Sequence, residues 1–403
     1  MERAILNAVT PFVDPLLGST LPPTVLVLVW VDGADKTEVM SFEDGFCFVG
    51  EDFGPRYPPT LSDAGLEVPE RRVLYVSHQG SRVRTGDGRL IVESEDDTKL
   101  LDLPTELVSR LVCFGSVGVS AGVRAWAMIH NVDVVFASRR GNYLGGLTAG
   151  SPVRITRVKA QIAAQDSPAS RDIARAIAEA KVRKQIVVLQ RFGRTEHADL
   201  VGETVAQMRQ ALLLLDGCTS AAEVMGVEGA AAAAYWPCLG SLLPVDVAFT
   251  NRSRQPPMNV ANAALSFLYT ILAAESVTAL HAAGLDPAFG LLHADEDHRP
   301  SLALDLMEEF RPLIVDQIVV QLARKGSLTT ESGRVDEGRS GVLLTKAARQ
   351  AVVEAYERRM TQMTRGALTD FSGTLRRHLY RQAQRLAASI VDPSLAWTGL
   401  SWR

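Results

Sequence analysis

Cysteine is scarce in this chain. Its 403 residues include only four cysteines, and no two of them form a Cys-x-x-Cys pair. Iron–sulfur clusters need about four thiolates, and zinc knuckles need paired ligands, so neither is indicated. Reduced thiols in an intracellular protein are the simplest interpretation. The four are Cys47, Cys113, Cys218 and Cys238.

Long hydrophobic runs and a secretion signal are also lacking. The longest apolar runs, such as Thr24–Val31, are too short to span a bilayer. The first residues, MERAILNAVTPFVDPLLGS, do not have the basic start and unbroken apolar stretch of a signal peptide. We therefore expect a cytoplasmic protein with no membrane partner.

A positive net charge is lacking as well. The net charge of −4 by itself argues against binding to nucleic acid. The distribution changes that expectation, because residues 1–70 contain twelve acids and only three bases, which leaves a net charge of +5 on the rest. An acidic front and a basic body permit a polyanionic partner.

The first part of the chain is irregular in composition. Residues 1–70 hold eight of the nineteen prolines, and Pro55–Glu70 is typical of a linker. Before that linker, Thr24–Gly33 and Glu38–Gly50 have the composition of two strands with turns. We interpret this part as an N-terminal extension whose role the sequence does not reveal.

The remaining chain divides into two patterns. Residues 71–157 contain short β-rich runs, a Gly-Asp-Gly hairpin signal and one short helical run. From about Ser170 onward, apolar residues recur every three or four positions, which predicts helices. The expected fold is therefore α+β, with a small β-domain over 71–157 and a larger all-α domain over 158–403, preceded by the acidic, proline-rich extension.

One acidic stretch interrupts the helical pattern. Pro300 and Ser301 are typical of a helix start with Ser301 as cap, and an apolar stripe follows. Asp305 and Glu308 then lie three positions apart on one helix face, where two carboxylates repel unless a cation compensates. His293 stands just before this helix, and two carboxylates with an imidazole make a plausible site for Mg²⁺ or Mn²⁺. The stripe comprises Leu302, Leu306, Phe310, Leu313 and Ile314.

A further acid, Glu228, lies in an alanine-rich helical run and shares a helix face with Tyr235. Such a carboxylate is expected to be partly buried and to need a partner, which His293 and Glu308 would supply. The ordinary interpretation is that these acids form a solvated face and that His293 is a packed histidine. On pattern alone this ordinary interpretation is favoured.

Basic residues form clusters that suit a polyanion. Arg377, Arg381 and Arg385 follow one another at steps of four on a predicted helix. Arg252 and Arg254 lie in a predicted loop, and Lys181 begins a third cluster. Each is ordinarily a solvated surface charge, but together they could contact phosphates.

Six motifs follow one another from about Arg72 onward: VLYVSHQGSRV, DLPTELVSRLVCFGSVGVS, VDVVFASRRGNYLGGL, VMGVEGAAAAAYW, NRSRQPPMNVANAALSFLYTILAAES and GLLHADEDHRPSLALDLMEEFRPLIVD. In this order they make the chain resemble CRISPR-associated protein 1, the integrase of CRISPR adaptation. This resemblance reverses the preference for solvated acids.

The resemblance implies a small β-domain followed by an all-α catalytic domain. It also implies that Glu228, His293 and Glu308 are catalytic metal ligands for Mg²⁺ or Mn²⁺, with Asp305 as a supporting catalytic acid. The implied reaction is attack by the 3′-hydroxyl of a short DNA duplex on a phosphodiester at a CRISPR repeat. Arg252, Arg254, Lys181, Arg377 and Arg381 are then the expected DNA-binding residues.

The implied partners are the spacer-precursor duplex, the CRISPR repeat and a second copy of the chain. A hetero-hexamer with CRISPR-associated protein 2 is also implied, and a nuclease like CRISPR-associated protein 4 is a further candidate. Some relatives are fused to that nuclease, yet Cys47 is the only cysteine before the linker, so we expect no cluster there. Asn259 departs from the pattern, because many relatives carry an acid at this position.

Two other functions remain open from the sequence. A non-catalytic DNA-binding scaffold subunit would use the same acids only to cap and solvate helices. An unrelated metallohydrolase is the third, although no His-Glu-x-x-His motif supports it. Convergence of Glu228, His293 and Glu308 on one point would argue against the scaffold.

Overall fold

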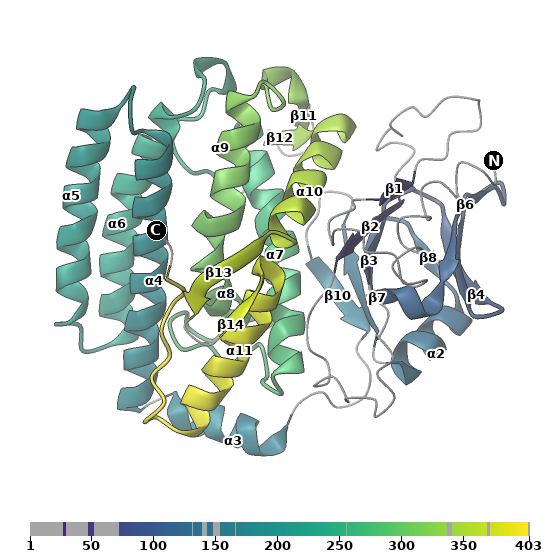
Figure 1. The fold of residues 1–403 in the computed structure, drawn as a ribbon, viewed down its shortest axis with the longest axis horizontal. Coiled ribbons are helices and arrows are strands. Elements are labelled where there is room, and N and C mark those ends of the chain that lie inside the picture. Colours follow the sequence, from purple (N-terminus) through teal and green to yellow (C-terminus); the bar gives the residue numbers. More distant parts are fainter. Residues whose placement is uncertain are drawn as a thin grey trace. The chain divides into compact units, whose positions relative to one another are not determined.

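The computed structural model separates into two compact units (Figure 1). The first comprises Met1–Ser151 and Arg349–Gln362, and the second comprises Pro152–Ala348 and Met363–Arg403. The structure describes residues 27–29, 47–51 and 72–401, apart from 131, 139–142, 148–153, 166, 255, 337–340 and 369–370.

The first unit is built on a six-stranded sheet with the strand order β1-β2-β3-β7-β9-β10. Its inner strands β3, β7 and β9 run parallel, and the strands outside them pair antiparallel. The parallel strands are rich in valine and leucine, as strands that are buried on both faces require. The strands are β1 (Val27–Val29), β2 (Cys47–Glu51), β3 (Arg72–Val76), β7 (Val108–Phe114), β9 (Asp133–Ala137) and β10 (Tyr143–Leu147).

A four-stranded sheet, β6-β5-β4-β8, completes this unit. The Gly-Asp-Gly hairpin is confirmed, since Asp87 and Gly88 join β4 to β5 with positive φ values of 52° and 71°. Buried side chains of both sheets and of helix α2 (Ala121–Ile129) form one apolar core. The remaining strands are β4 (Arg82–Gly86), β5 (Arg89–Glu93), β6 (Lys99–Pro104) and β8 (Gly118–Val119).

The N-terminal extension contributes to this unit. Its described residues are two short strands, of which β1 pairs with β2 and β2 pairs with β3. The predicted linker Pro55–Glu70 lies outside the described residues. Helix α10 (Lys346–Met360) also joins the first unit through most of its length, where Tyr75 donates a hydrogen bond to Glu357.

The second unit is mostly helical, as expected. Helices α4, α5 and α6 contact one another, and α7 contacts α8, α9 and α11 (Figure 1). By length and composition α7 could cross a membrane, but 72% of its apolar window is buried inside the protein, as in a core helix. The helices are α3 (Ile155–Ala164), α4 (Pro168–Phe192), α5 (Ala198–Leu215), α6 (Ala221–Ser241), α7 (Val260–Ala282), α8 (Ser301–Met307), α9 (Gln317–Arg324) and α11 (Leu375–Val391).

The second unit is not all-α, which corrects the expectation. Two antiparallel hairpins interrupt the helices: β11 (Gly333–Asp336) with β12 (Gly341–Leu344), and β13 (Met363–Leu368) with β14 (Phe371–Thr374). Each strand has only four to six residues. Strands this short do not show a clear alternating pattern, and they lie between strongly helical runs.

A π-helical segment, Arg311–Asp316, separates α8 from α9. Pro312 has no N–H, so the carbonyl of Glu308 cannot receive the usual bond from the residue four positions later. The chain widens locally instead of continuing as an α-helix. This change of pitch follows directly after the acidic stretch that the sequence singled out.

Candidate metal centre

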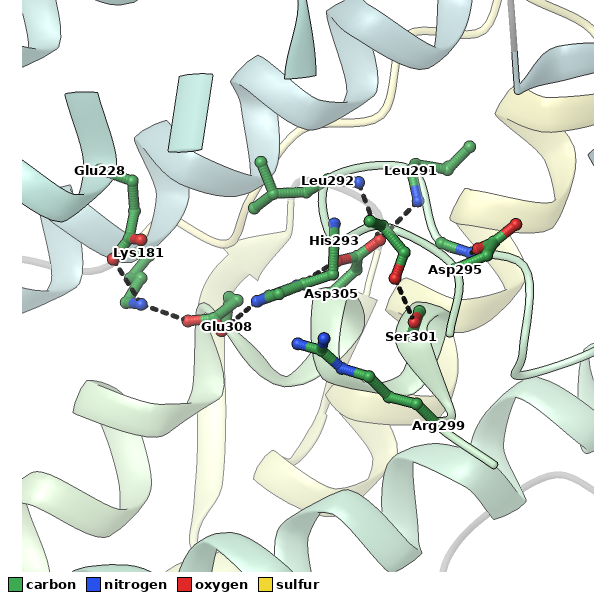
Figure 2. Close-up of polar contacts among 12 residues, drawn as sticks. Lys181, Glu228, Leu291, Leu292, His293, Asp295, Arg299, Ser301, Asp305 and Glu308 are labelled. Carbon is green, nitrogen blue, oxygen red and sulfur yellow. Dashed lines mark hydrogen bonds and ion pairs between the residues drawn. The ribbon is translucent and has the colours of Figure 1, made fainter. Parts of the chain in front are cut away.

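Three acidic or basic side chains from separate elements meet beside α8 (Figure 2). Lys181 on α4 places its Nζ 2.6 Å from Glu228 Oε1 and 2.6 Å from Glu308 Oε2. Glu228 comes from α6, and Glu308 directly follows α8. Two carboxylates far apart in sequence therefore share one cation.

Glu308 is the most deeply buried member of this group, with a side-chain exposure of 2%. Burial alone would raise the pKa of its carboxyl group. The positive charges of Arg311 and Lys181, together with His293, outweigh burial and lower the pKa to about 2. Glu308 is thus an ionised carboxylate at neutral pH, held in a site that excludes most water.

His293 lies between the two acids of the α8 region (Figure 2). Its Nδ1 is 2.6 Å from Asp305 Oδ1, and its Nε2 is 3.8 Å from Glu308 Oε1. Nδ1 is thus held by the Asp305 carboxylate, and Nε2 is the ring nitrogen that faces Glu308. Histidine ligands of metal ions are commonly oriented in this way, by a carboxylate on the second ring nitrogen.

Asp305 also holds the turn that carries His293. Its Oδ2 accepts hydrogen bonds from the backbone N–H groups of Leu291 (2.7 Å) and Leu292 (2.9 Å), and its Oδ1 accepts one from His293 (3.0 Å). A Cβ on Gly290 would come within 2.2 Å of the carbonyl oxygen of His293, so only glycine fits this turn. Asp305 therefore positions His293 and has little capacity left for another partner.

The start of α8 differs from the sequence expectation. Ser301 was predicted to cap this helix, but it is the first residue within α8, and its hydroxyl donates to the carbonyl of Ala294. The residues of the apolar stripe, from Leu302 to Ile314, are fully buried. That stripe anchors α8 in the core, so Asp305 and Glu308 are carried on a fixed element.

A second polar cluster near this site was missed by the sequence analysis. The buried carboxylate of Asp316 accepts hydrogen bonds from the hydroxyl groups of Tyr235 (2.7 Å) and Tyr269. The guanidinium groups of Arg252 and Arg311 lie over the Tyr269 ring, 5.6 and 5.1 Å from its centroid. The available signal was Asp316 itself, a lone acid inside the apolar run Leu313–Val320.

Comparison with known proteins identifies the family. The family model described as CRISPR associated protein Cas1 matches residues 74–358, which is more than half of the chain. The chain belongs to the Cas1 family. It is 34% identical over 342 residues to CRISPR-associated endonuclease Cas1 2 of Rhodospirillum rubrum, covering 82% of this chain and 98% of that protein.

Fused and assembled Cas1 proteins are similar as well. A Cas4 exonuclease–Cas1 endonuclease fusion of Myxococcus xanthus is 29% identical, over 82% of this chain and 58% of the fusion. A Cas6-RT-Cas1–Cas2 complex aligns with a TM-score of 0.72 at 23% identity, over 86% of this chain and 39% of that one. A casposase bound to integration product aligns with a TM-score of 0.69 at 22% identity, over 78% of this chain and 89% of that one. At these identities the structural matches show the Cas1 fold.

The basic residues expected to bind DNA occupy different environments in this Cas1. Lys181 is buried against the acids, and Arg252 is engaged internally with Asn262 and Ser266, each at 2.9 Å. Arg254 and Arg377 are exposed, while Arg381 is half-buried and donates to Gln384. DNA contact by these five residues stays a prediction, and the exposed Arg254 and Arg377 are the readiest for it.

The departure at Asn259 also has a local role in this Cas1. Asn259 is the N-cap of α7, and its side-chain oxygen accepts the backbone N–H of Asn262 at 2.8 Å. Asparagine and aspartate cap helices about equally well. The same cap would be available to an acid at this position.

The acidic site of this Cas1 is held together by a lysine. Among the described residues, no three His, Cys, Asp or Glu side chains are placed to hold a metal ion as they stand. The shared position between Glu228 and Glu308 is taken by the Lys181 ammonium instead. The predicted ligands lie next to one another, and Nε2 of His293 is 3.8 Å from Oε1 of Glu308.

Replacing Asp305 by asparagine keeps the size of the side chain but is expected to weaken the contacts that hold His293 and its turn. In either orientation the amide NH₂ would face two hydrogen-bond donors that Asp305 now satisfies. We expect Mn²⁺ affinity to fall by about 10–100-fold, the usual cost of losing a carboxylate that supports a metal ligand. Titration of free Mn²⁺ by electron paramagnetic resonance measures it, with Asp297→Asn in the exposed loop as the matched control.

Proposed function

We propose that this protein is a metal-dependent DNA endonuclease and integrase of CRISPR adaptation. It would insert short duplex DNA into a repeat array by attack of a 3′-hydroxyl on a phosphodiester. One observation carries the proposal: Glu228 and Glu308, from separate elements, share one cation position, and His293 Nε2 faces the same carboxylate. A scaffold whose acids were only solvated would have no reason to bury them together.

The donor set fits Mg²⁺ or Mn²⁺. Two carboxylates and a neutral imidazole nitrogen suit these ions, and a positive charge is already stabilised at the carboxylate oxygens. Glu228, His293 and Glu308 would hold the ion. When bound, it would polarise the scissile phosphate and neutralise charge that develops in phosphoryl transfer.

The surrounding side chains supply positioning. Asp305 contacts Nδ1 of His293 and fixes the ring by accepting the backbone N–H groups of residues 291–293. Arg311, 3.3 Å from Glu308, adds positive charge next to the site. Arg254 and Arg377 would bind the DNA backbone, since their exposed guanidinium groups suit phosphate oxygens.

The proposed partners follow the family. We propose that the protein forms a homodimer and joins Cas2 in a hetero-hexamer, as the Cas1–Cas2 complex among the structural matches suggests. A Cas4-like nuclease is a further proposed partner, because relatives exist as Cas4–Cas1 fusions. DNA duplexes and the CRISPR repeat are the proposed substrates.

A joining assay tests this function directly. The protein and its Cas2 partner are incubated with Mn²⁺, a labelled short duplex and a supercoiled plasmid that carries the repeat. We expect label to become covalently attached to the plasmid. The matched control is the same duplex with 3′-dideoxy ends, which can bind but cannot attack, and it should give no joined product.

The two function classes separate in this assay. Joining that depends on the 3′-hydroxyl supports the integrase. DNA binding with no joining by either duplex would instead support a scaffold subunit. Equal plasmid cleavage with the 3′-hydroxyl and the 3′-dideoxy duplex would support the nuclease activity and contradict the integrase activity.

A further inference from the structure

Lys181 is an unusual residue to find between two carboxylates that are proposed to bind a metal. It projects from the middle of α4, with a side-chain exposure of 10%, and its ammonium contacts both Glu228 and Glu308 at 2.6 Å (Figure 2). A lysine buried to this degree must be paired, because an isolated buried charge is strongly unfavourable. Its pairing is complete only when both acids are available to it.

The same oxygens cannot serve a lysine and a divalent ion in the same way. Oxygen ligands lie about 2.0–2.1 Å from Mg²⁺, so a metal ion at the shared position would occupy the place of the ammonium. Charge points the same way. The two glutamates are already compensated by the cations that contact them, Lys181 and Arg311, so a divalent ion that binds the same oxygens favours the departure of one of these cations. Arg311 contacts only one of the two acids in the site, whereas Lys181 bridges both.

We propose that Lys181 is a built-in counter-cation that holds Glu228 and Glu308 together in the metal-free protein and is displaced when a divalent ion binds. This inference rests on the proposed metal site. It assigns to Lys181 a role in setting metal affinity, in place of the permanent DNA contact expected from its charge. The lysine keeps the two acids close and prevents their repulsion from opening the site.

Metal binding by variants tests the exchange. In Lys181→Met the competitor is gone, so the Kd for Mn²⁺, measured from the free-ion paramagnetic resonance signal, is expected to fall on the order of tenfold, a usual size for coupling between two ligands. Lys184→Met is the matched control. Lys184 is also buried on α4, but its ammonium donates to the carbonyl of Leu400 and touches neither acid of the site.

The unmodified protein gives an independent readout. Lys181 should react with an amine-acylating reagent several-fold faster in the presence of Mn²⁺, as followed by mass spectrometry, while Lys184 remains protected. This measurement does not depend on the folding of any variant. The counter-cation proposal would be overturned by either of two results. One is wild-type protein that binds Mn²⁺ with no change in the acylation rate of Lys181. The other is a Lys181→Met variant that binds Mn²⁺ no more tightly than the wild type.

The two failures are distinguishable. If neither the wild-type protein nor Glu308→Gln binds Mn²⁺, the metal site of the proposed function is wrong. The proposed displacement of Lys181 by the metal ion is then wrong as well. If the wild type binds Mn²⁺ and Glu308→Gln does not, the metal site stands. The comparison of Lys181 with Lys184, in Mn²⁺ affinity and in acylation rate, then tests only whether the metal ion displaces Lys181.

Discussion

Replacing His293 by alanine is expected to reduce strand joining on the order of 10³-fold or more while leaving DNA binding intact. The substitution removes the only imidazole of the proposed ligand set, and metal-ion stabilisation of the transition state is worth several kcal/mol. The side chain is half-buried at the edge of the site and makes no contact that organises a core. The fold should therefore survive the change.

The control for this variant lies in the same loop. His298 is exposed and has a φ of 64°, so asparagine, which tolerates this backbone conformation, is the suitable replacement. His298→Asn should join DNA like the wild type. Joining is measured with the repeat plasmid, and duplex binding is followed by fluorescence anisotropy. Equal joining by His293→Ala and wild type would refute the assignment of His293, even with the integrase activity intact.

Replacing Arg376 by methionine is expected to destabilise the helical unit by about 3–5 kcal/mol. Arg376 on α11 is fully buried, and its Nε and Nη2 donate to both carboxylate oxygens of Glu275 on α7, at 3.0 and 2.9 Å. Without the guanidinium, the carboxylate of Glu275 loses both of these bonds while it stays in the core. For a unit of this size the melting temperature should fall on the order of 10 °C by scanning calorimetry.

Two further variants sharpen this test. Arg377→Met changes the neighbouring, exposed arginine and should shift the free energy of unfolding by less than about 0.5 kcal/mol. The double variant Glu275→Met with Arg376→Met removes both charges, and it should recover much of the lost stability, since apolar replacement of a buried pair is often neutral. A double variant less stable than Arg376→Met alone would show that the pair is not the cause.

Periodicity in the sequence predicts most of the fold because the long elements bury regularly spaced or continuous apolar residues. The strands around Leu74 and Leu111, which are buried on both faces, and the helices α4 to α7 follow this rule. The hairpins β11–β12 and β13–β14 do not, since their strands are too short to show a period against helical neighbours. The π-helical segment was also missed. Pro312 signals an interruption, but the local pitch depends on what packs around it.

The acids of the site were singled out for a physical reason, which is that carboxylates in apolar helices need partners. This reasoning found Glu228, Asp305 and Glu308 but not the partner itself. Lys181 has the local sequence of a surface lysine, within a run of basic residues. Its burial depends on α6 and the α8 region approaching α4 in space, and no spacing along α4 carries that information.

The way Asp305 fixes His293 has a consequence for protein engineering. Among the described contacts, those that fix the ring and its turn come from Asp305 and from Asp295, which accepts the backbone N–H of Gly290 at 2.7 Å, and the exposed Asp297 has no part in them. A fluorophore or spin label could be attached at Asp297 as a local reporter. It would sit a few residues from the proposed metal centre and would test in single-molecule recordings whether DNA reaches it.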